Sequence, residues 1–404
     1  MLMFTLISCL RYVIHPALTT YLGGYDGRSH LEPLAETYIE AVYVMIYEFI
    51  CVAVIILIYE YKGRKTDFIS GLLKPTLGVK YAIVFFIFCF VIVLINPSAL
   101  IQINFVFPTA ITDGTIIDSS TMLYSYLFIL AKNILCINVL YALSLKYNEG
   151  KNKKYLLFAM LVTFISILIY SGTNRTDILI NAIVLMFFLY KLFGRVALKT
   201  SLILVILMPI IFSIITQHRQ YVTRDQTSLE LKNDYMQTYF GGVYNVAIGL
   251  EIENNYPEAS HYSVMLFDIF RPMIGVGLFI KNMDIKYSNI YFNDRMWRHV
   301  DRRSQIMPMV AQGNLYFGFI GAPIFTVLFV MLALKLIKFI NGNLGLELKF
   351  FLSLVTARMG MVFGQNTMNL INDLSMNLFI VILLFALVAF ISRISTNEKS
   401  DANT

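Results

Sequence analysis

The sequence predicts an all-α, polytopic membrane protein with about ten transmembrane helices and one large extracytoplasmic loop that contains short helices. Three observations lead to this prediction. Hydrophobic residues make up 58% of the 404 residues and the mean hydropathy is +0.69, which leaves too little polar surface to cover a soluble core. Apolar runs of about 17 to 25 residues, long enough to cross a bilayer, recur along the chain. One long polar connection, 217–310, interrupts them.

Ten apolar runs are expected to cross the membrane. The first run is the weakest, because Arg11, His15 and Pro16 interrupt it. The remaining nine contain few charged residues and are separated by polar connections. In chain order the ten predicted spans are 3–22, 38–59, 77–96, 121–145, 155–171, 177–193, 198–216, 314–340, 349–370 and 374–393.

The basic residues of the connections predict the orientation, because Lys and Arg accumulate in cytoplasmic loops. The connection 60–80 carries five of them and "KYNEGKNKK" carries four, whereas 97–120 carries none. Both termini are therefore expected in the cytoplasm. The predicted division is an N-terminal membrane bundle over 1–216, the extracytoplasmic loop 217–310, C-terminal membrane helices over 311–393 and a cytoplasmic tail over 394–404.

Several classes of chemistry have no signal in the sequence. The four cysteines all lie in apolar runs, so we expect packing residues rather than disulfides. The net charge of +7 follows from the membrane topology, and no nucleic-acid-binding motif accompanies it. No H-E-x-x-H, Asp-x-Asp or paired His/Cys spacing is present, so neither a metal nor another cofactor is expected. No cleavable signal peptide is expected.

The long outer loop is rich in arginine. Seven of its ten basic residues are arginines, whose planar fork binds phosphate or carboxylate through two hydrogen bonds. The stretch "RMWRHVDRRSQ", 295–305, is the densest part, and a helical conformation would place three of its arginines on one face. An anion such as a pyrophosphate would relieve their repulsion, although surface ion pairs remain an alternative explanation. The seven arginines are Arg219, Arg224, Arg271, Arg295, Arg298, Arg302 and Arg303.

Charged residues also lie where a bilayer disfavours them. Glu48, Lys132 and Arg358 fall near the middle of predicted spans, where an ionisable group is by default a functional candidate. The alternative is a structural buried pair, for instance Glu48 with one of the cations. Arg175 lies in "YSGTNRTD", a short outer turn that we expect to face a cavity, unless it is an interfacial anchor.

Aromatic residues of the loop are candidates for sugar contacts. Tyr239 and Tyr244 lie among amide and acidic residues, the combination that binds the apolar faces and hydroxyls of sugars. Tyrosine is also common at membrane surfaces, which is the competing explanation. The nearby stretch 262–283 is apolar but contains Asp268 and Arg271, so we expect an interfacial or re-entrant helix pair there.

The sequence resembles the Wzy-type bacterial oligosaccharide repeat-unit polymerases, also called O-antigen or capsular polysaccharide polymerases. The resemblance is carried by "LRYVIHP" followed by a span with "MIYE", by "YSGTNRTD", by the arginine-rich loop and by "QGNLYFGFIGAPIF". It implies a glycosyltransferase of the plasma (inner) membrane. Such an enzyme transfers sugar with inversion on the outer face, with polyprenyl-diphosphate-linked oligosaccharides as donor and acceptor.

Residue roles follow from this chemistry. Arg298 and Arg302 are expected to stabilise the departing diphosphate, whose negative charge grows in the transition state. His299 is the first candidate for the base that deprotonates the acceptor hydroxyl, with Glu251 and Asp225 as rivals. The remaining candidates for substrate binding are Arg175, Arg219, Arg224, Arg271, Arg295, Arg303, Arg358, Tyr239 and Tyr244.

The expected partners are a polyprenyl-diphosphate-linked oligosaccharide, membrane lipid, a chain-length regulator protein and a flippase. Two other functions remain open. A polysaccharide ligase would share the loop and its arginines. A flippase or transporter of lipid-linked oligosaccharides would share the intramembrane charges, but it would ordinarily show two similar halves and short loops. A scaffold protein would give Lys132 and Arg358 no purpose.

Overall fold

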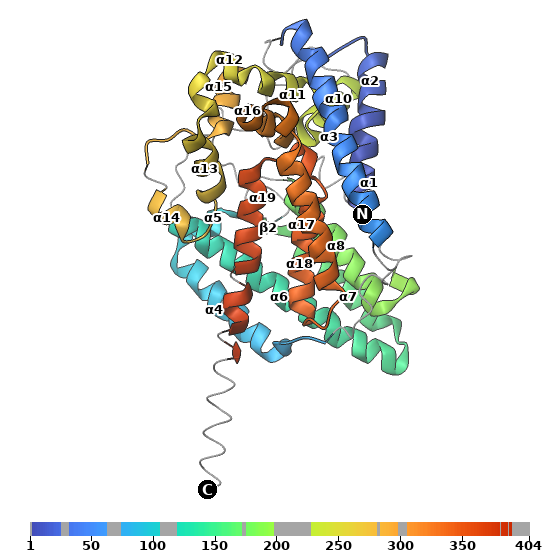
Figure 1. Ribbon diagram of the computed structural model, residues 1–404. Coiled ribbons are helices and arrows are strands. Elements are labelled where there is room, and N and C mark those ends of the chain that lie inside the picture. The colour runs from blue at the N-terminus through green and yellow to red at the C-terminus, as the bar shows by residue number, and fades with distance from the viewer. Residues whose placement is uncertain are drawn as a thin grey trace. The chain divides into compact units, whose positions relative to one another are not determined.

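The chain folds almost entirely into helices (Figure 1). The computed structural model describes residues 2–25, 32–62, 74–105, 119–171, 175–197, 228–280, 283–297, 305–379, 381–386 and 388–389. In these ranges the only sheet is a pair of three-residue antiparallel strands, β1 (Ile103–Phe105) and β2 (Ile169–Ser171). The mostly helical class predicted from the sequence is confirmed.

Five helices in the described ranges are long and apolar enough to cross a membrane. The helical segments Ala35–Lys62, Gly78–Ile95, Leu123–Gly150 and Thr176–Phe193 coincide with four predicted spans, and Thr367–Ala386 overlaps the last two. A sixth is formed by α16 (Met309–Gly321) and α17 (Ile324–Ile340) if this pair, bent by 105°, is counted as one span. The number of ten spans stays a prediction.

Besides the bent pair α16 and α17 at 314–340, three predicted spans are not single continuous helices. The first is α1 (Leu2–Cys9) and α2 (His15–Tyr21) joined by a π-helical turn, Leu10–Ile14. The fifth, α7 (Lys153–Leu168), gives way to strand β2. The predicted span 349–370 is divided, because α18 (Leu346–Met359) ends at Gly360 and a 3₁₀ turn precedes α19 (Thr367–Leu374). The predicted span 198–216 lies outside the described residues, as does the tail 394–404.

The chain divides into two compact units, each built from segments distant in sequence. The first unit comprises Met1–Phe68, Arg224–Phe339 and Val355–Ile380; the second comprises Ile69–Thr223, Ile340–Leu354 and Val381–Thr404. The predicted boundaries at 216, 310 and 393 instead follow the order of the chain and stay a prediction.

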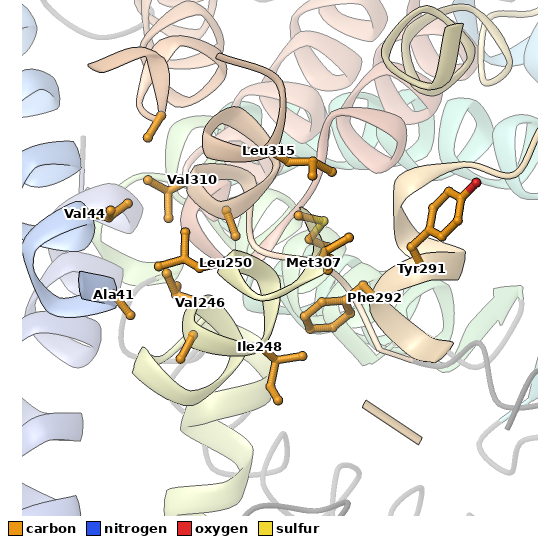
Figure 2. Packing of buried hydrophobic residues seen from close by; sticks show 14 of the residues in the cluster. Ala41, Val44, Val246, Ile248, Leu250, Tyr291, Phe292, Met307, Val310 and Leu315 are labelled. Atoms are coloured by element: carbon orange, nitrogen blue, oxygen red, sulfur yellow. The ribbon is translucent and has the colours of Figure 1, made fainter. Parts of the chain in front are cut away.

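The first unit buries a core of aliphatic and aromatic side chains (Figure 2). It is formed by α3 (Ala35–Lys62), α11 (Val243–Leu250), α15 (Ser288–Trp297) and α16. Small residues bring these helices close together: a Cβ atom on Gly249 of α11 would lie 2.5 Å from that of Ala311 on α16. This core is the platform for most of the predicted loop residues that the structure describes.

Short helices complete the first unit. Five of the seven whose bounds follow lie within 217–310, where the sequence predicts short helices; that this segment is one extracytoplasmic loop stays a prediction. The stretch predicted to be an interfacial or re-entrant helix pair contains two of them, α13 and α14. The bounds are α10 (Ser228–Phe240), α12 (Ile252–Asn255), a 3₁₀ turn (Pro257–Ser260), α13 (Tyr262–Phe270), α14 (Val276–Ile280), a 3₁₀ turn (Val362–Gly364) and a π turn (Ser375–Phe379).

The second unit packs α4 (Gly78–Ile95) and α7 against α6 (Ser119–Gly150), with α5 (Pro97–Ile101) and α8 (Arg175–Phe193) beside them. The first nine residues of α18 belong to this unit. There the buried carboxylate of Glu347 accepts hydrogen bonds from the backbone N–H groups of Thr76 and Leu77, at 2.8 and 3.1 Å. Free N–H groups at a helix start attract an anion, so Glu347 stabilises the beginning of α4.

Candidate functional site

The described part of the arginine-rich stretch begins with an ion pair. Arg295, on the last turn of α15, binds the carboxylate of Glu251, which follows α11 and is itself 4% exposed. The second oxygen of Glu251 accepts the backbone N–H of Leu34 at 2.8 Å, just before α3 begins. Arg295 is therefore held in one place by a carboxylate that both α3 and α11 help to position.

Asparagine side chains of α15 form hydrogen bonds with the backbone on the far side of this stretch, and we call these residues the amide cluster. Asn293 donates from Nδ2 to the carbonyl of Gln305 at 2.9 Å and accepts the backbone N–H of Gln305 at 3.0 Å. Asn289 donates to the same carbonyl at 2.8 Å and accepts the N–H of Met307, also at 2.8 Å. Asn293 and Gln305, the described residues that flank 294–304, are thus bonded to each other, and four of the seven loop arginines lie between them in the sequence.

Most of the predicted catalytic residues fall on positions that the structure leaves undescribed. The sequence is described up to Trp297 and again from Gln305, so the central residues of "RMWRHVDRRSQ" are absent from the description. Arg175 is the first residue of α8, but its side chain is not described. The site residues outside the described ranges are Arg219, Arg224, Asp225, Arg298, His299, Arg302 and Arg303.

Arg271 is described, and its guanidinium stacks on aromatic rings. Its Cζ lies 4.5 Å from the ring centre of Tyr287 and 5.7 Å from that of Phe267, and Nη1 is 3.7 Å from the sulfur of Met368. Stacking of this kind fixes the plane of a guanidinium while leaving its edges available for hydrogen bonds. Its role as a substrate-binding residue stays a prediction.

The two predicted sugar-binding tyrosines differ in their surroundings. Tyr239 on α10 is half-buried, and its ring centre lies 6.3 Å from that of Tyr235. Tyr244 on α11 is 1% exposed and packs edge-on against Tyr25 within the core of the first unit, with the ring centres 5.1 Å apart. Tyr244, one of the two tyrosines predicted to bind sugar, is therefore a core residue that stabilises the fold.

The charged residues predicted within spans have specific partners. Glu48 on α3 belongs to a buried ion pair, as the alternative expected, but its partner is Arg11 and neither Lys132 nor Arg358. Arg358 at the end of α18 binds Asp373 of α19, with Nε 2.7 Å from Oδ2, across the break between these two helices. Lys132 on α6 donates to the carbonyls of Ser166 and Ile169 at 2.6 and 2.9 Å, at the end of α7. A cation at a helix C-terminus stabilises its free carbonyl groups, so Lys132 has a structural purpose.

A buried carboxylate that sequence reasoning did not select lies in the first unit. Asp268 on α13 accepts hydrogen bonds from the hydroxyl of Ser288 at 2.5 Å, from Nε2 of Gln312 at 2.6 Å and from the hydroxyl of Tyr316 at 2.7 Å. Burial raises the pKa of Asp268, and the hydrogen bonds oppose that rise. The available signal was its position as an acidic residue inside an otherwise apolar stretch.

The site residues that the structure brings together are thus Arg295 and Glu251, with the amide cluster beside them. α11, α12, α15 and α16, which carry or flank these residues, lie together in Figure 1. In the described ranges no three His, Cys, Asp or Glu side chains are arranged to hold a metal ion. Comparison of the chain with protein-family models, with curated proteins and with solved structures gives no match.

Proposed function

We propose that this protein polymerises polyprenyl-diphosphate-linked oligosaccharide repeat units into a surface polysaccharide, O-antigen or capsule, on the outer face of the plasma membrane. The reaction is an inverting, metal-independent glycosyl transfer. The observation that carries the proposal is the anchoring of the arginine-rich stretch, in which Glu251 fixes Arg295 and the amide cluster joins the chain on both sides at Asn293 and Gln305.

The proposed reaction requires cations in fixed positions beside the leaving group. The acceptor hydroxyl attacks the anomeric carbon, the bond from that carbon to the diphosphate oxygen breaks, and polyprenyl diphosphate leaves with the electron pair. Its negative charge is larger in the transition state than in the bound donor, so guanidinium groups held in place stabilise the transition state more than the ground state. In this proposal Arg298 and Arg302 bind the diphosphate, and Arg295 supports them from α15.

Three residues are candidates for the general base: His299, Glu251 and Asp225. Glu251 binds Arg295 through one oxygen and the N–H of Leu34 through the other, so its charge is already neutralised and its position is fixed. Both oxygens of Glu251 thus have partners within the protein, which suits a residue that positions Arg295. We therefore assign to Glu251 the placement of Arg295, and we keep His299 as the first candidate for the base that deprotonates the acceptor hydroxyl, with Asp225 as its rival.

The test uses the purified protein in liposomes with synthetic lipid-linked repeat units and follows the ladder of polymer lengths. Arg298→Ala and Arg302→Ala are expected to lower turnover about 100-fold or more, as for the loss of a transition-state donor. Lysine at either position is expected to restore only part of it, because a point charge does not reproduce a bidentate fork. Lys232→Ala is the matched control, since this exposed cation lies in the same loop on α10.

The outcomes separate the proposal from its rivals. Normal polymer from the Arg298→Ala/Arg302→Ala double variant would refute the role of the stretch. Transfer of sugar only to an unrelated acceptor, without a ladder, would identify a ligase. Movement of lipid-linked units across the bilayer without new glycosidic bonds would identify a flippase.

A further inference from the structure

The outer face of α3 carries a feature that the proposed function does not use. One side of this helix packs into the core of the first unit through Ala41 and Val44 (Figure 2). The opposite side exposes large apolar residues, among them Tyr43, which is 62% exposed. α3 is long and apolar enough to cross a membrane, so this side is expected to face lipid.

An open groove of about 410 Å³ runs along this exposed side. Its floor is formed by the apolar side chains of α3, and Phe319 of α16 forms a wall. The wall is fixed in place, because the ring of Tyr47 stacks on Phe319 with the centres 5.5 Å apart and the planes 10° apart. The Tyr47 hydroxyl also donates to the carbonyl of Ile320 at 3.1 Å. A preformed apolar groove of this volume falls in the size range of small-molecule sites.

The groove has a charged end. Glu36 and Glu40 line it in the first two turns of α3, and no Lys or Arg is among its lining residues. Residues four apart on a helix lie on the same face, so the two carboxylates are neighbours. A ligand that fills this groove therefore meets hydrocarbon along most of its length and two negative charges at one end.

We propose that this groove binds a membrane lipid whose head group carries a primary amine. The hydrocarbon chain lies along Ile46 and Phe319, and the ammonium group is held between Glu36 and Glu40. A primary ammonium has three N–H donors for the two carboxylates. A purely anionic head group is repelled there, and a quaternary ammonium cannot donate hydrogen bonds.

The position of the charged end agrees with this occupant. Glu36 and Glu40 lie at the beginning of a helix that crosses the membrane, where lipid head groups are found, and the groove continues toward Ile50 in the hydrocarbon region. The lipid site is separate from the proposed polymerase site, because it involves neither the arginine-rich stretch nor any catalytic step.

The test measures lipid retention by native mass spectrometry. The full-length protein is reconstituted with equal amounts of dioleoyl phosphatidylethanolamine, phosphatidylcholine and phosphatidylglycerol, extracted in mild detergent and analysed for bound lipid. We expect phosphatidylethanolamine to be retained about tenfold over each of the other two, as for charge-assisted hydrogen bonds to an ammonium group.

Two changes and one control locate the site. Glu36→Gln/Glu40→Gln is expected to reduce the preference to about one, because it removes both charges and preserves the shape of the side chains. Phe319→Ala is expected to reduce retention of all three lipids. Glu60→Gln is the control, because this residue lies on α3 outside the groove and is exposed. Equal retention of the three lipids by the wild type, or an unchanged preference in the Glu36→Gln/Glu40→Gln variant, would overturn the inference.

Discussion

Arg11 and Glu48 form an ion pair in which Nη1 and Oε2 are 2.9 Å apart and neither side chain is exposed. Glu48 also accepts the hydroxyl groups of Tyr12 at 3.3 Å and Thr326 at 2.6 Å. The guanidinium of Arg11 lies over the ring of Phe363, 4.7 Å from its centre. One carboxylate thus joins the π-helical turn, α3 and α17 within the first unit.

We expect Glu48→Gln to lower the free energy of unfolding by about 3 to 5 kcal/mol, because it leaves a buried guanidinium without a counter-charge. The measurement is thermal unfolding of the detergent-solubilised protein. The double variant Arg11→Met/Glu48→Met should recover much of the loss, since it removes both buried charges together. Glu60→Gln, at an exposed position of the same helix, should have no effect. Equal stability of Glu48→Gln and wild type would contradict the importance of this pair.

Lys132→Met is expected to destabilise the protein although methionine suits an apolar span. The substitution leaves the carbonyls of Ser166 and Ile169 without their donor, at a cost of about 1 to 3 kcal/mol for each unsatisfied group. Thermal unfolding again provides the measurement, with Lys80→Met, an exposed lysine of α4, as the control. Similar melting temperatures for the two variants would show that Lys132 is not needed at the end of α7.

The sequence predicted the mostly helical class and its long apolar helices, because a helix needs about 20 consecutive apolar residues to cross a bilayer and such runs are visible in the sequence. It predicted less well where a helix breaks. Gly360 and Asn366 border the division of the predicted span 349–370, yet the surrounding hydrophobicity conceals it. Broken helices at such positions depend on partners for their free backbone groups: the N–H of Thr367, for example, is bound by Oε1 of Gln312 at 3.0 Å.

The partners of the charged residues also could not be predicted from the sequence. Glu48 was recognised as half of a possible pair, but nothing in the order of residues selects Arg11, which lies 37 positions earlier. Asp268 was overlooked as a site because its donors come from α15 and α16, and their approach is set by packing in the first unit. Arg295 was selected because local charge density is visible in the sequence, whereas its partner Glu251 was visible only as a rival base.

Asp268 predicts a dependence of stability on pH. Burial holds its pKa in the folded protein above the ordinary value of 3.8. Between these two pKa values the folded protein keeps a proton that the unfolded chain has lost, so the free energy of unfolding falls as pH rises through that window. Melting temperatures recorded against pH should show this fall in the wild type and in Asp284→Asn, an exposed control. The fall should be absent from Asp268→Asn, and its persistence there would assign it to another group.

Arg358→Ala should disrupt the connection between α18 and α19, because Asp373 then loses the cation 2.7 Å away. Arg358→Lys should keep much of the stability and of the polymerising activity, since the charge remains. The comparison requires both the melting temperature and the polymer ladder for each variant. A melting temperature unchanged in Arg358→Ala together with lost activity would assign Arg358 to substrate rather than to Asp373. Full activity and normal stability of Arg358→Ala would show that Arg358 is needed neither for substrate binding nor for the connection to Asp373.

A substitution in the amide cluster can test whether these residues position the arginine-rich stretch or only stabilise the fold. Asn293→Ala removes two of the three hydrogen bonds that join α15 to Gln305 and leaves only the one from Asn289, so the two ends of the stretch are held together less firmly. We expect turnover of lipid-linked units to fall about tenfold or more, because catalytic groups must be positioned to within a fraction of an ångström. Membrane insertion and expression should remain near normal. Asn293→Asp keeps the acceptor for the Gln305 N–H but loses the donor, so it should fall between Ala and the wild type. Asn341→Ala, in the connection after α17, is the amide control. Wild-type turnover in Asn293→Ala would mean that the arginines act without this anchor.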